Sequence, residues 1–235
     1  MKVMIYQHGT LATLMAGMLQ GTVSINDMLE QGDMGIGTLT GCDGEVIFVN
    51  GNAYHANEYG EFRRLNGDEM LPFATITKFD PTQSFEVLEV TKQDALYDQI
   101  LQRMKSRNLF SAIRIDGSFN HVHVRMMPKQ EPPYERLMTS VNRQPEHHYD
   151  YVNGTIVGFF TPELFHGVGS AGFHLHFVDQ DRTVGGHILG FELERGSVDI
   201  SDAETFEQHF PTQDEAFLEA DIDYENIDEE IRMAE

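Results

Sequence analysis

The sequence predicts an α+β protein of two sheet-containing halves, in which mixed β-sheets are accompanied by a few helices. Apolar residues recur at helical spacing near the N-terminus, and short β-rich runs punctuated by glycine occupy most of the remainder. A proline-rich segment with little apolar periodicity separates two β-rich regions. The 235 residues, 40% of them hydrophobic, are enough to bury a core in one large domain or in two modest ones.

Two short helices are expected before the first β-rich region. Apolar side chains at helical spacing over residues 10–20 predict one stripe packed against a core. Ser24 and Asp27 form a capping-box pattern at the start of the second helix, and Gly32 is a suitable end for it. A third helix is expected over residues 93–105, with Thr91 and Asp94 positioned to cap it.

The β-rich runs predict strands in both halves. In the first half these are residues 35–39, 45–49, 73–79, 84–90, 109–115 and 119–125, and in the second half residues 155–160, 172–178, 184–193 and 198–200. Asp116-Gly117 predicts a turn between the last two strands of the first half, because glycine accepts positive φ cheaply.

A domain boundary is expected in the proline-rich segment of residues 127–148. This division predicts an N-terminal α+β domain over residues 1–127. A C-terminal β-rich domain is expected over residues 128–235.

Composition and charge limit the possible partners and location. The chain has 16 basic and 38 acidic side chains and a formal charge of −22, which opposes binding to nucleic acid or to anionic lipid surfaces. No apolar run approaches the roughly 18 residues of a membrane span, and no signal peptide is evident. The single cysteine, Cys42, rules out an intramolecular disulfide and favours a reducing compartment. A soluble cytoplasmic protein is therefore expected.

Three histidines form the most informative pattern in the chain. Alternate side chains of a strand point the same way, so His174 and His176 share one face of their predicted strand. A hairpin turning near residues 181–182 would set His187 roughly opposite His176. Three neutral imidazoles with an open fourth position are a standard catalytic zinc arrangement. The predicted metal ligands are therefore His174, His176 and His187.

The same spacing occurs in a second histidine pair. His121 and His123 lie on the predicted strand before Arg125 and have no evident third partner in a short hairpin. They are interpreted as exposed strand residues. A histidine pair of this spacing also arises by chance, so the spacing alone does not establish a metal site.

Other functions are compatible with three converging histidines. A cupin barrel also places two histidines on one strand and a third on another, but Asp179 and Asp181 stand where its glutamate is expected. A zinc hydrolase is a further enzymatic alternative. A noncatalytic acidic protein would use the histidines as a structural metal site, which a fourth protein ligand normally closes. No cysteine lies nearby to serve, which favours an open catalytic site.

Several short motifs follow one another along nearly the whole chain. They are Tyr6-Gln7, residues 11–21, Leu29, Gly35-Ile36-Gly37-Thr38, Asp43-Gly44-Glu45, residues 115–119 with Arg125, residues 167–176 and Gly185-Gly186-His187. Their order and separations resemble the bacterial acetolactate decarboxylase family.

This resemblance implies an activity and a cofactor. The activity is the conversion of 2-acetolactate to acetoin, as in acetoin and butanediol fermentation. The cofactor is zinc, held by the positions matching His174, His176 and His187 and acting as the electron sink for the enediolate left after decarboxylation. The resemblance also implies a homodimer.

The resemblance further implies site residues from both halves of the chain. It assigns catalytic roles to Glu45 and Arg125, contributed across a cleft by the first half, and places Thr38 along the substrate site. It also implies a C-terminal glutamate that folds back over the metal; Glu235 is the candidate, and Glu230 is the alternative. Without the resemblance, Glu45 is interpreted as an exposed turn carboxylate and Arg125 as a member of a surface ion pair.

Overall fold

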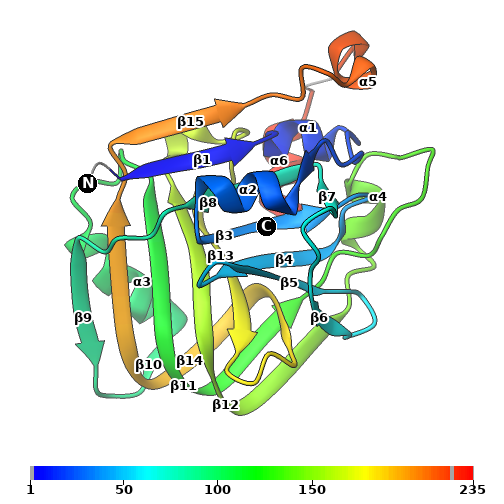
Figure 1. The fold of residues 1–235 in the computed structure, drawn as a ribbon. Coiled ribbons are helices and arrows are strands. Elements are labelled where there is room, and N and C mark those ends of the chain that lie inside the picture. The colour runs from blue at the N-terminus through cyan, green and yellow to red at the C-terminus, as the bar shows by residue number, and fades with distance from the viewer. Residues whose placement is uncertain (1–2, 223–224, 235) are drawn as a thin grey trace.

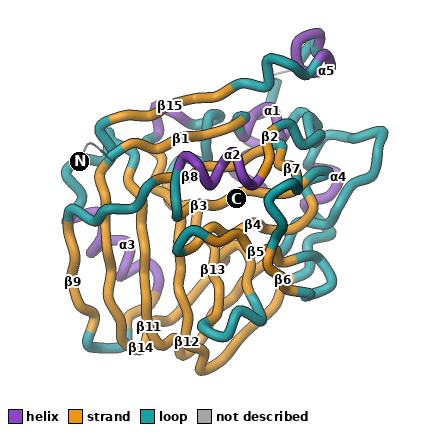
Figure 2. The backbone as a smooth tube through the Cα atoms, viewed as in Figure 1, coloured by secondary structure: helices purple, strands orange, loops and turns teal. Residues whose placement is uncertain are grey.

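The structure, a computed structural model, describes residues 3–222 and 225–234. Two large β-sheets pack against each other, and short helices lie at their edges and on their outer sides (Figure 1). Strands make up most of the regular structure along the backbone (Figure 2). The predicted α+β class, with mixed sheets and few helices, is confirmed.

The first sheet has seven strands in the order β15-β1-β8-β3-β4-β5-β6. Their bounds are β1 (Met4–His8), β3 (Met34–Leu39), β4 (Asp43–Val49), β5 (Asn52–Ala56), β6 (Phe62–Arg64), β8 (Phe73–Thr77) and β15 (Thr205–His209). β15 runs parallel to β1, whereas β1 and β8 are antiparallel, so the sheet is mixed. A separate two-stranded sheet pairs β2 (Val23–Ser24) with β7 (Met70–Leu71).

The second sheet contains the longest strands of the molecule. Its members are β9 (Gln83–Val87), β10 (Thr91–Lys92), β11 (Ser111–Arg125), β12 (Glu146–Thr161), β13 (Gly172–Asp179) and β14 (Gly185–Asp202). β14 pairs with β11, β11 with β12, β12 with β13, and β13 again with β14. These four strands therefore form a closed ring of pairings.

The predicted turn at Asp116-Gly117 was wrong, because β11 continues through it. Gly117 lies in register with Gly154 of β12 on one side and Gly196 of β14 on the other. A Cβ on Gly117 would collide with the backbone oxygen of Arg195. Glycine here permits close approach of neighbouring strands, not a chain reversal.

The helices are short. In the part of the chain that the structure describes they are α1 (Leu11–Met15), α2 (Ile25–Gln31), α3 (Gln93–Arg103), α4 (Met138–Val141), α5 (Glu215–Glu219) and α6 (Ile227–Ala234), with one 3₁₀ turn, η1 (Glu163–Phe165). The capping box of Ser24 and Asp27 at the start of α2 is confirmed. Over residues 3–222 and 225–234, no helix is long and apolar enough to cross a membrane.

Two expectations about helix ends were wrong. α1 ends at Met15 instead of continuing to residue 20, and Gly17 just beyond it adopts a φ of +92° that leaves the right-handed helix. α3 starts after Lys92 without a side-chain cap, so neither Thr91 nor Asp94 caps it.

Apolar packing on the two sides of the second sheet shows which side chains of β13 face the first sheet. Leu175 and Phe177 pack into an apolar cluster with Ile100 of α3, on one side of the second sheet. A second cluster joins the opposite side of that sheet to the first sheet, through residues such as Phe159 and Ile47. His174 and His176 alternate with the first set, so they lie on the side that faces the first sheet.

Both sheets take strands from each side of the expected boundary between residues 127 and 128. β15 joins the first sheet beside β1, and β11 pairs with β12 and β14 in the second sheet. Sheet membership does not follow that boundary, and the division into two domains stays a prediction.

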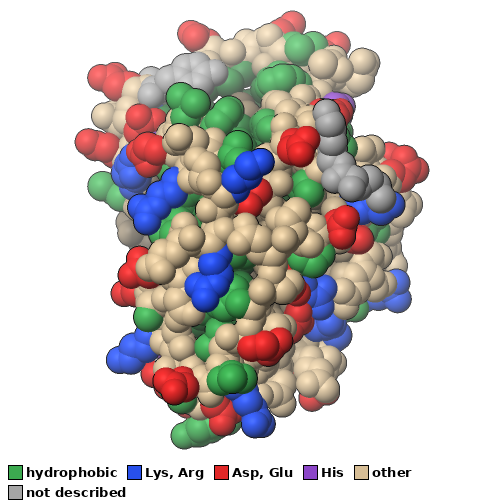
Figure 3. Space-filling model, turned by 90° about the vertical axis from the view of Figure 1, so that its left-hand side faces the viewer, with side chains coloured by type: hydrophobic (Ala, Val, Ile, Leu, Met, Phe, Trp, Pro, Cys, Tyr) green, Lys and Arg blue, Asp and Glu red, His purple; other side chains and the backbone are tan. Residues whose placement is uncertain are grey.

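Charged side chains of both signs are scattered over the face shown in Figure 3. Acidic residues outnumber basic residues by 38 to 16 in the whole chain, yet red and blue side chains are interspersed on this face. The residues drawn there form no continuous basic surface of the kind that binds a phosphate backbone.

Candidate active site

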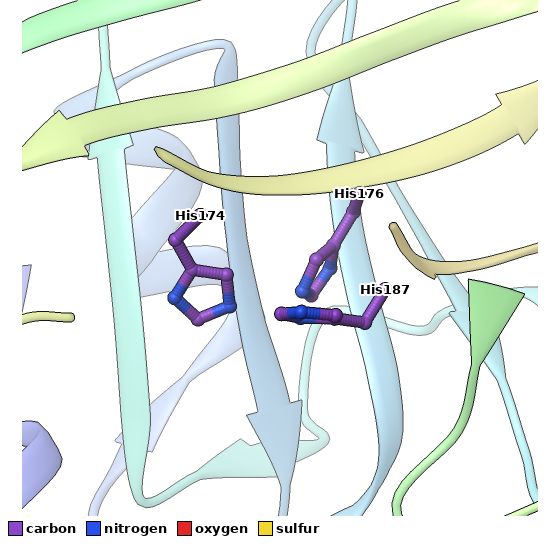
Figure 4. A group of neighbouring side chains, drawn as sticks. All are labelled: His174, His176 and His187. Atoms are coloured by element: carbon purple, nitrogen blue, oxygen red, sulfur yellow. The ribbon is translucent and has the colours of Figure 1, made fainter. Parts of the chain in front are cut away.

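Three imidazole rings meet between the two sheets. Figure 4 shows His174, His176 and His187 turned toward one another, with ring centroids separated by 4.8 to 5.4 Å. Each ring offers a nitrogen within 4.8 Å of those of the other two. His176 lies directly opposite His187 in the β13–β14 hairpin, as strand alternation and the turn position predicted.

The glycine before His187 allows β14 to approach β11. Gly186 has a φ of +154°, and a Cβ there would lie 2.9 Å from the Cβ of Val124. Any larger residue would push β14 away from β11, and His187 away from its register partner Arg125.

Hydrogen bonding sets the tautomer of His176. Its Nδ1 lies 3.0 Å from the carbonyl oxygen of Val46, and a carbonyl can only accept, so Nδ1 carries the proton. In the neutral ring, Nε2 therefore presents a lone pair. This nitrogen is buried and has no hydrogen-bond partner among the described residues. A metal-binding histidine is commonly oriented by such a bond on its other nitrogen.

Burial keeps all three rings neutral. Loss of solvation, followed by the positive charge of Arg125, lowers the pKa of His174 to about 3. Burial also holds the pKa values of His176 and His187 well below 6.5. Near neutral pH these imidazoles have their lone pairs free of protons, which is the state that binds a metal.

Glu45 reaches this group from β4 of the first sheet. Its residue is 9% exposed, so it is not the exposed turn carboxylate of the simpler interpretation. One carboxylate oxygen accepts from the backbone N–H of Met127 at 3.1 Å, and the other lies 3.3 Å from His176 Nε2. The second contact brings a carboxylate oxygen close to an imidazole lone pair, an arrangement that a cation or a proton between them stabilises.

Arg125 brings a buried cation to the same place from β11. It is 6% exposed, so it is not part of a surface ion pair. Its guanidinium donates to Gln144 Oε1 at 2.6 Å and to His187 Nε2 at 3.2 Å. Its Nε is buried without a hydrogen-bond partner among the described residues. A desolvated guanidinium with an unused donor is well suited to hold an anionic group of a small molecule.

Except for the alternative candidate Glu230, the described residues predicted for the site line one cavity. These are Thr38, Glu45, Arg125, His174, His176 and His187. Thr38 donates its hydroxyl proton to the carbonyl oxygen of Gly44 at 2.8 Å, which leaves oxygen lone pairs for a ligand. The remaining wall is largely apolar and comes from Leu11, Leu14, Phe73, Met127, Leu137 and Ala234.

The two C-terminal candidates differ in what the structure describes. Glu235 lies outside the described residues. Glu230 accepts from Arg136 Nη2 at 2.7 Å and is not among the residues that line the cavity.

Sequence reasoning missed two groups that hold the site together. The Gln144 side chain fixes Arg125, and the Met127 backbone fixes Glu45, yet both residues lie in the segment interpreted as a connection. The apolar wall was partly predictable, because Leu11 and Leu14 belong to the apolar stripe expected over residues 10–20.

The donor set fits a transition metal. Two of the rings are almost completely buried, all three are neutral, and His176 directs an unused lone pair into the cavity. Imidazole nitrogens of this kind suit zinc and its neighbours in the first transition row. The residues present can therefore hold such an ion.

The chain is similar over nearly its whole length to known proteins. A model of the family described as alpha-acetolactate decarboxylase matches residues 5–224. The alpha-acetolactate decarboxylase of Lactococcus lactis subsp. lactis is 41% identical over 231 residues, covering 98% of this chain and 98% of the relative.

Solved structures agree with this similarity. A crystal structure of alpha-acetolactate decarboxylase from Bacillus subtilis is 34% identical, has a TM-score of 0.95 and covers 99% of each chain. A Staphylococcus aureus protein of unknown function, described as similar to alpha-acetolactate decarboxylase, is 57% identical with a TM-score of 0.97. That match covers 99% of this chain and 100% of the other.

The resemblance proposed from the order of the motifs is confirmed by sequence and by fold. The chain belongs to the alpha-acetolactate decarboxylase family, whose members are carboxy-lyases.

Proposed function

We propose that the protein catalyses the zinc-dependent decarboxylation of 2-acetolactate to acetoin. The observation that carries this proposal is the cavity in which three neutral imidazoles, a buried carboxylate and a buried guanidinium converge. Family membership supplies the substrate. His174, His176 and His187 would hold the zinc ion, which when bound supplies a Lewis acid that accepts the electrons released with carbon dioxide.

Arg125 would bind and orient the substrate carboxylate. Its guanidinium is buried, presents planar N–H donors that match a carboxylate, and is held in place by Gln144. A fixed cation next to the histidines positions the carboxylate for departure before the bond breaks.

Glu45 would handle the proton that replaces carbon dioxide. The backbone N–H of Met127 fixes one carboxylate oxygen, so the other stays directed toward the histidines. A carboxyl group held in one place can deliver a proton to one face of the product only. Glu235 is the proposed second proton-handling residue, with Glu230 as its alternative, and Thr38 would accept a hydrogen bond from the substrate hydroxyl.

The apolar wall of the cavity would keep bulk water from the reacting groups. Leu14, Phe73 and Leu137 are among the apolar residues that line it. Exclusion of water strengthens the electrostatic interactions of Arg125 and Glu45 with the substrate.

We further infer a homodimeric assembly, a cytoplasmic location and a place in acetoin and butanediol formation. The resemblance to the family supports the assembly and the pathway, and composition supports the location. Sedimentation analysis of the purified protein tests the assembly, because a monomer would contradict it.

The experiment that tests the function measures acetoin formed from racemic 2-acetolactate, with the metal content of the same sample determined in parallel. We expect acetoin above the spontaneous rate and about one tightly held zinc per chain, both lost in His176→Ala. Retained zinc without acetoin would end the decarboxylase proposal and leave a cupin-like or hydrolytic metalloenzyme. Undiminished acetoin from metal-free protein would end the zinc proposal instead.

A further inference from the structure

A second group of histidines and carboxylates lies outside the candidate active site, where β11 pairs with β12. His123 stands directly opposite His148, and His121 stands opposite Asp150. Cross-strand partners project on the same side of a sheet, so these four side chains share one surface. The long β11–β12 ladder fixes their register, which makes this a prearranged group on a rigid scaffold.

The side chains of this group are in direct contact. The rings of His123 and His148 stack with centroids 4.0 Å apart, and His121 stacks on His148 at 5.2 Å. Glu146, at the start of β12, places a carboxylate oxygen 2.7 Å from His123 Nε2. Potential ligand atoms of His123, Glu146 and His148 all lie within 4.8 Å of one another.

The surroundings leave this group open to ions from solution. Glu146 and His148 are exposed, and His123 is half-buried. An open groove beside it is lined by Lys92, Gln93, Asp94, His121, His123 and Glu192 among others. The side-chain amide oxygen of Gln93 is buried and has no hydrogen-bond partner among the described residues. This oxygen lies beside Gly190, the register partner of His123.

We propose that His123, Glu146 and His148 form a second metal site that binds a divalent late transition-metal ion such as Zn²⁺. Two imidazoles and one carboxylate make a mixed nitrogen and oxygen donor set, which such ions prefer over the all-oxygen sites of calcium or magnesium. His121 stands behind His148, with Nε2 3.2 Å from His148 Nδ1 and with Nδ1 2.7 Å from Asp150. This relay is of the kind that orients and polarises a metal-binding histidine.

A metal ion bound at this second site would cross-link the ends of β11 and β12 next to Arg125. Glu146 is the register partner of Arg125, and the side chain of Gln144, two residues earlier, binds the Arg125 guanidinium. An ion shared by His123 and Glu146 would cross-link β11 and β12 at this point. The protein should therefore resist thermal unfolding better when the second site is filled. This site is separate from the His174 group and does not depend on the proposed decarboxylation.

The test is calorimetric titration of Zn²⁺ into the protein already loaded with its tightly held metal. We expect a second, weaker equivalent per chain, accompanied by a rise in Tm. The double variant H123A/H148A should lose the second equivalent and the rise in Tm while retaining the first. Glu146→Gln keeps the shape of the side chain and removes its charge, and it should weaken the second site by about 10-fold or more.

His147→Ala is the matched control, because His147 neighbours His148 but stacks with Tyr149 instead of His123. It should bind both equivalents. The proposal is overturned if the wild-type protein takes up no second equivalent, or if H123A/H148A takes up as many as the wild type. If the double variant does not fold, unchanged binding by Glu146→Gln overturns the proposal on its own.

Discussion

Two histidine pairs with identical spacing have opposite surroundings in this molecule. His174 and His176 on β13 face the first sheet, and His176 is only 1% exposed. His121 and His123 on β11 face solvent and carboxylates, with 41% and 25% of their side chains exposed. The spacing decides that each pair shares a face, whereas the packing of the rest of the fold decides how far solvent reaches each pair and therefore which chemistry is available to it.

The largest expected difference between the two groups is in turnover. His176→Ala removes a proposed metal ligand, so acetoin formation should fall to the spontaneous rate, a larger loss than the roughly 10²- to 10⁴-fold expected for a proton-transfer group. The exposed group consists of His121, His123, Glu146, His148 and Asp150, and His148→Ala in this group should leave kcat unchanged. A steady-state assay of both variants with matched protein concentration checks this.

Two outcomes would contradict this expected difference in turnover. Substantial acetoin formation by His176→Ala would remove the buried group from the reaction. Loss of turnover in His148→Ala, with the fold intact by circular dichroism, would show that the exposed group takes part in it.

The second largest difference is expected between two glutamates. Glu45→Gln should retain zinc but lose about 10²- to 10⁴-fold in turnover, since the amide keeps the contact geometry and cannot exchange a proton. Glu146→Gln in the exposed group should retain full turnover. Metal analysis and single-turnover kinetics of both variants separate loss of chemistry from loss of metal, and normal turnover in Glu45→Gln would exclude Glu45 from the mechanism.

Short-range geometry explains what could be predicted of the site from sequence. Strand alternation placed His174 and His176 on one face, and a two-strand hairpin placed His187 opposite His176; both depend on a few neighbouring residues. Glu45 and Arg125 entered only through the family resemblance. They come from β4 and β11, and nothing local in the sequence reports how the two sheets pack.

The partners of His121 and His123 in the exposed group could not be predicted either, because they also depend on residues far along the chain. Residues 127–148 are rich in proline and were interpreted as a connection, yet β12 begins within them at Glu146. The partners of His121 and His123 therefore lie on a strand whose start was missed. The false turn at Asp116-Gly117 has the same origin, because the pairing of Gly117 with Gly154 and Gly196 depends on residues far along the chain.

His8 shows the effect of burial on a histidine that belongs to neither group. His8 is fully buried outside both groups, and it contacts Thr22 Oγ1 at 2.7 Å and His209 Nδ1 at 2.8 Å. Burial, followed by the neighbouring His209, lowers its pKa from 6.5 to about 4. The unfolded chain then binds a proton more readily than the folded protein between these values. The contribution of His8 to stability is thus intact above pH 6.5 and is lost as the pH falls toward 4.

The expected size of this effect is about 3 kcal/mol at its limit, from roughly 1.4 kcal/mol per pKa unit. Urea unfolding of the wild type and His8→Gln between pH 4 and pH 7 measures it. The stability of the wild type should fall more steeply than that of the variant over this range. Parallel curves would mean that His8 is accessible to protons in the folded protein.

The smallest expected effect concerns the exposed ion pair of His121 and Asp150. Its atoms are 2.7 Å apart, but 41% and 66% of the two side chains are exposed, so solvent and salt screen the interaction. Asp150→Asn should change the free energy of unfolding by less than about 1 kcal/mol, and by less still at high salt. Denaturant titrations at low and high ionic strength, without added metal, measure this difference. A loss of several kcal/mol that persists in high salt would show that the exposed group is shielded from solvent in the assembled protein. Burial would then no longer distinguish the two histidine groups, and the difference between them would have to come from their neighbouring residues.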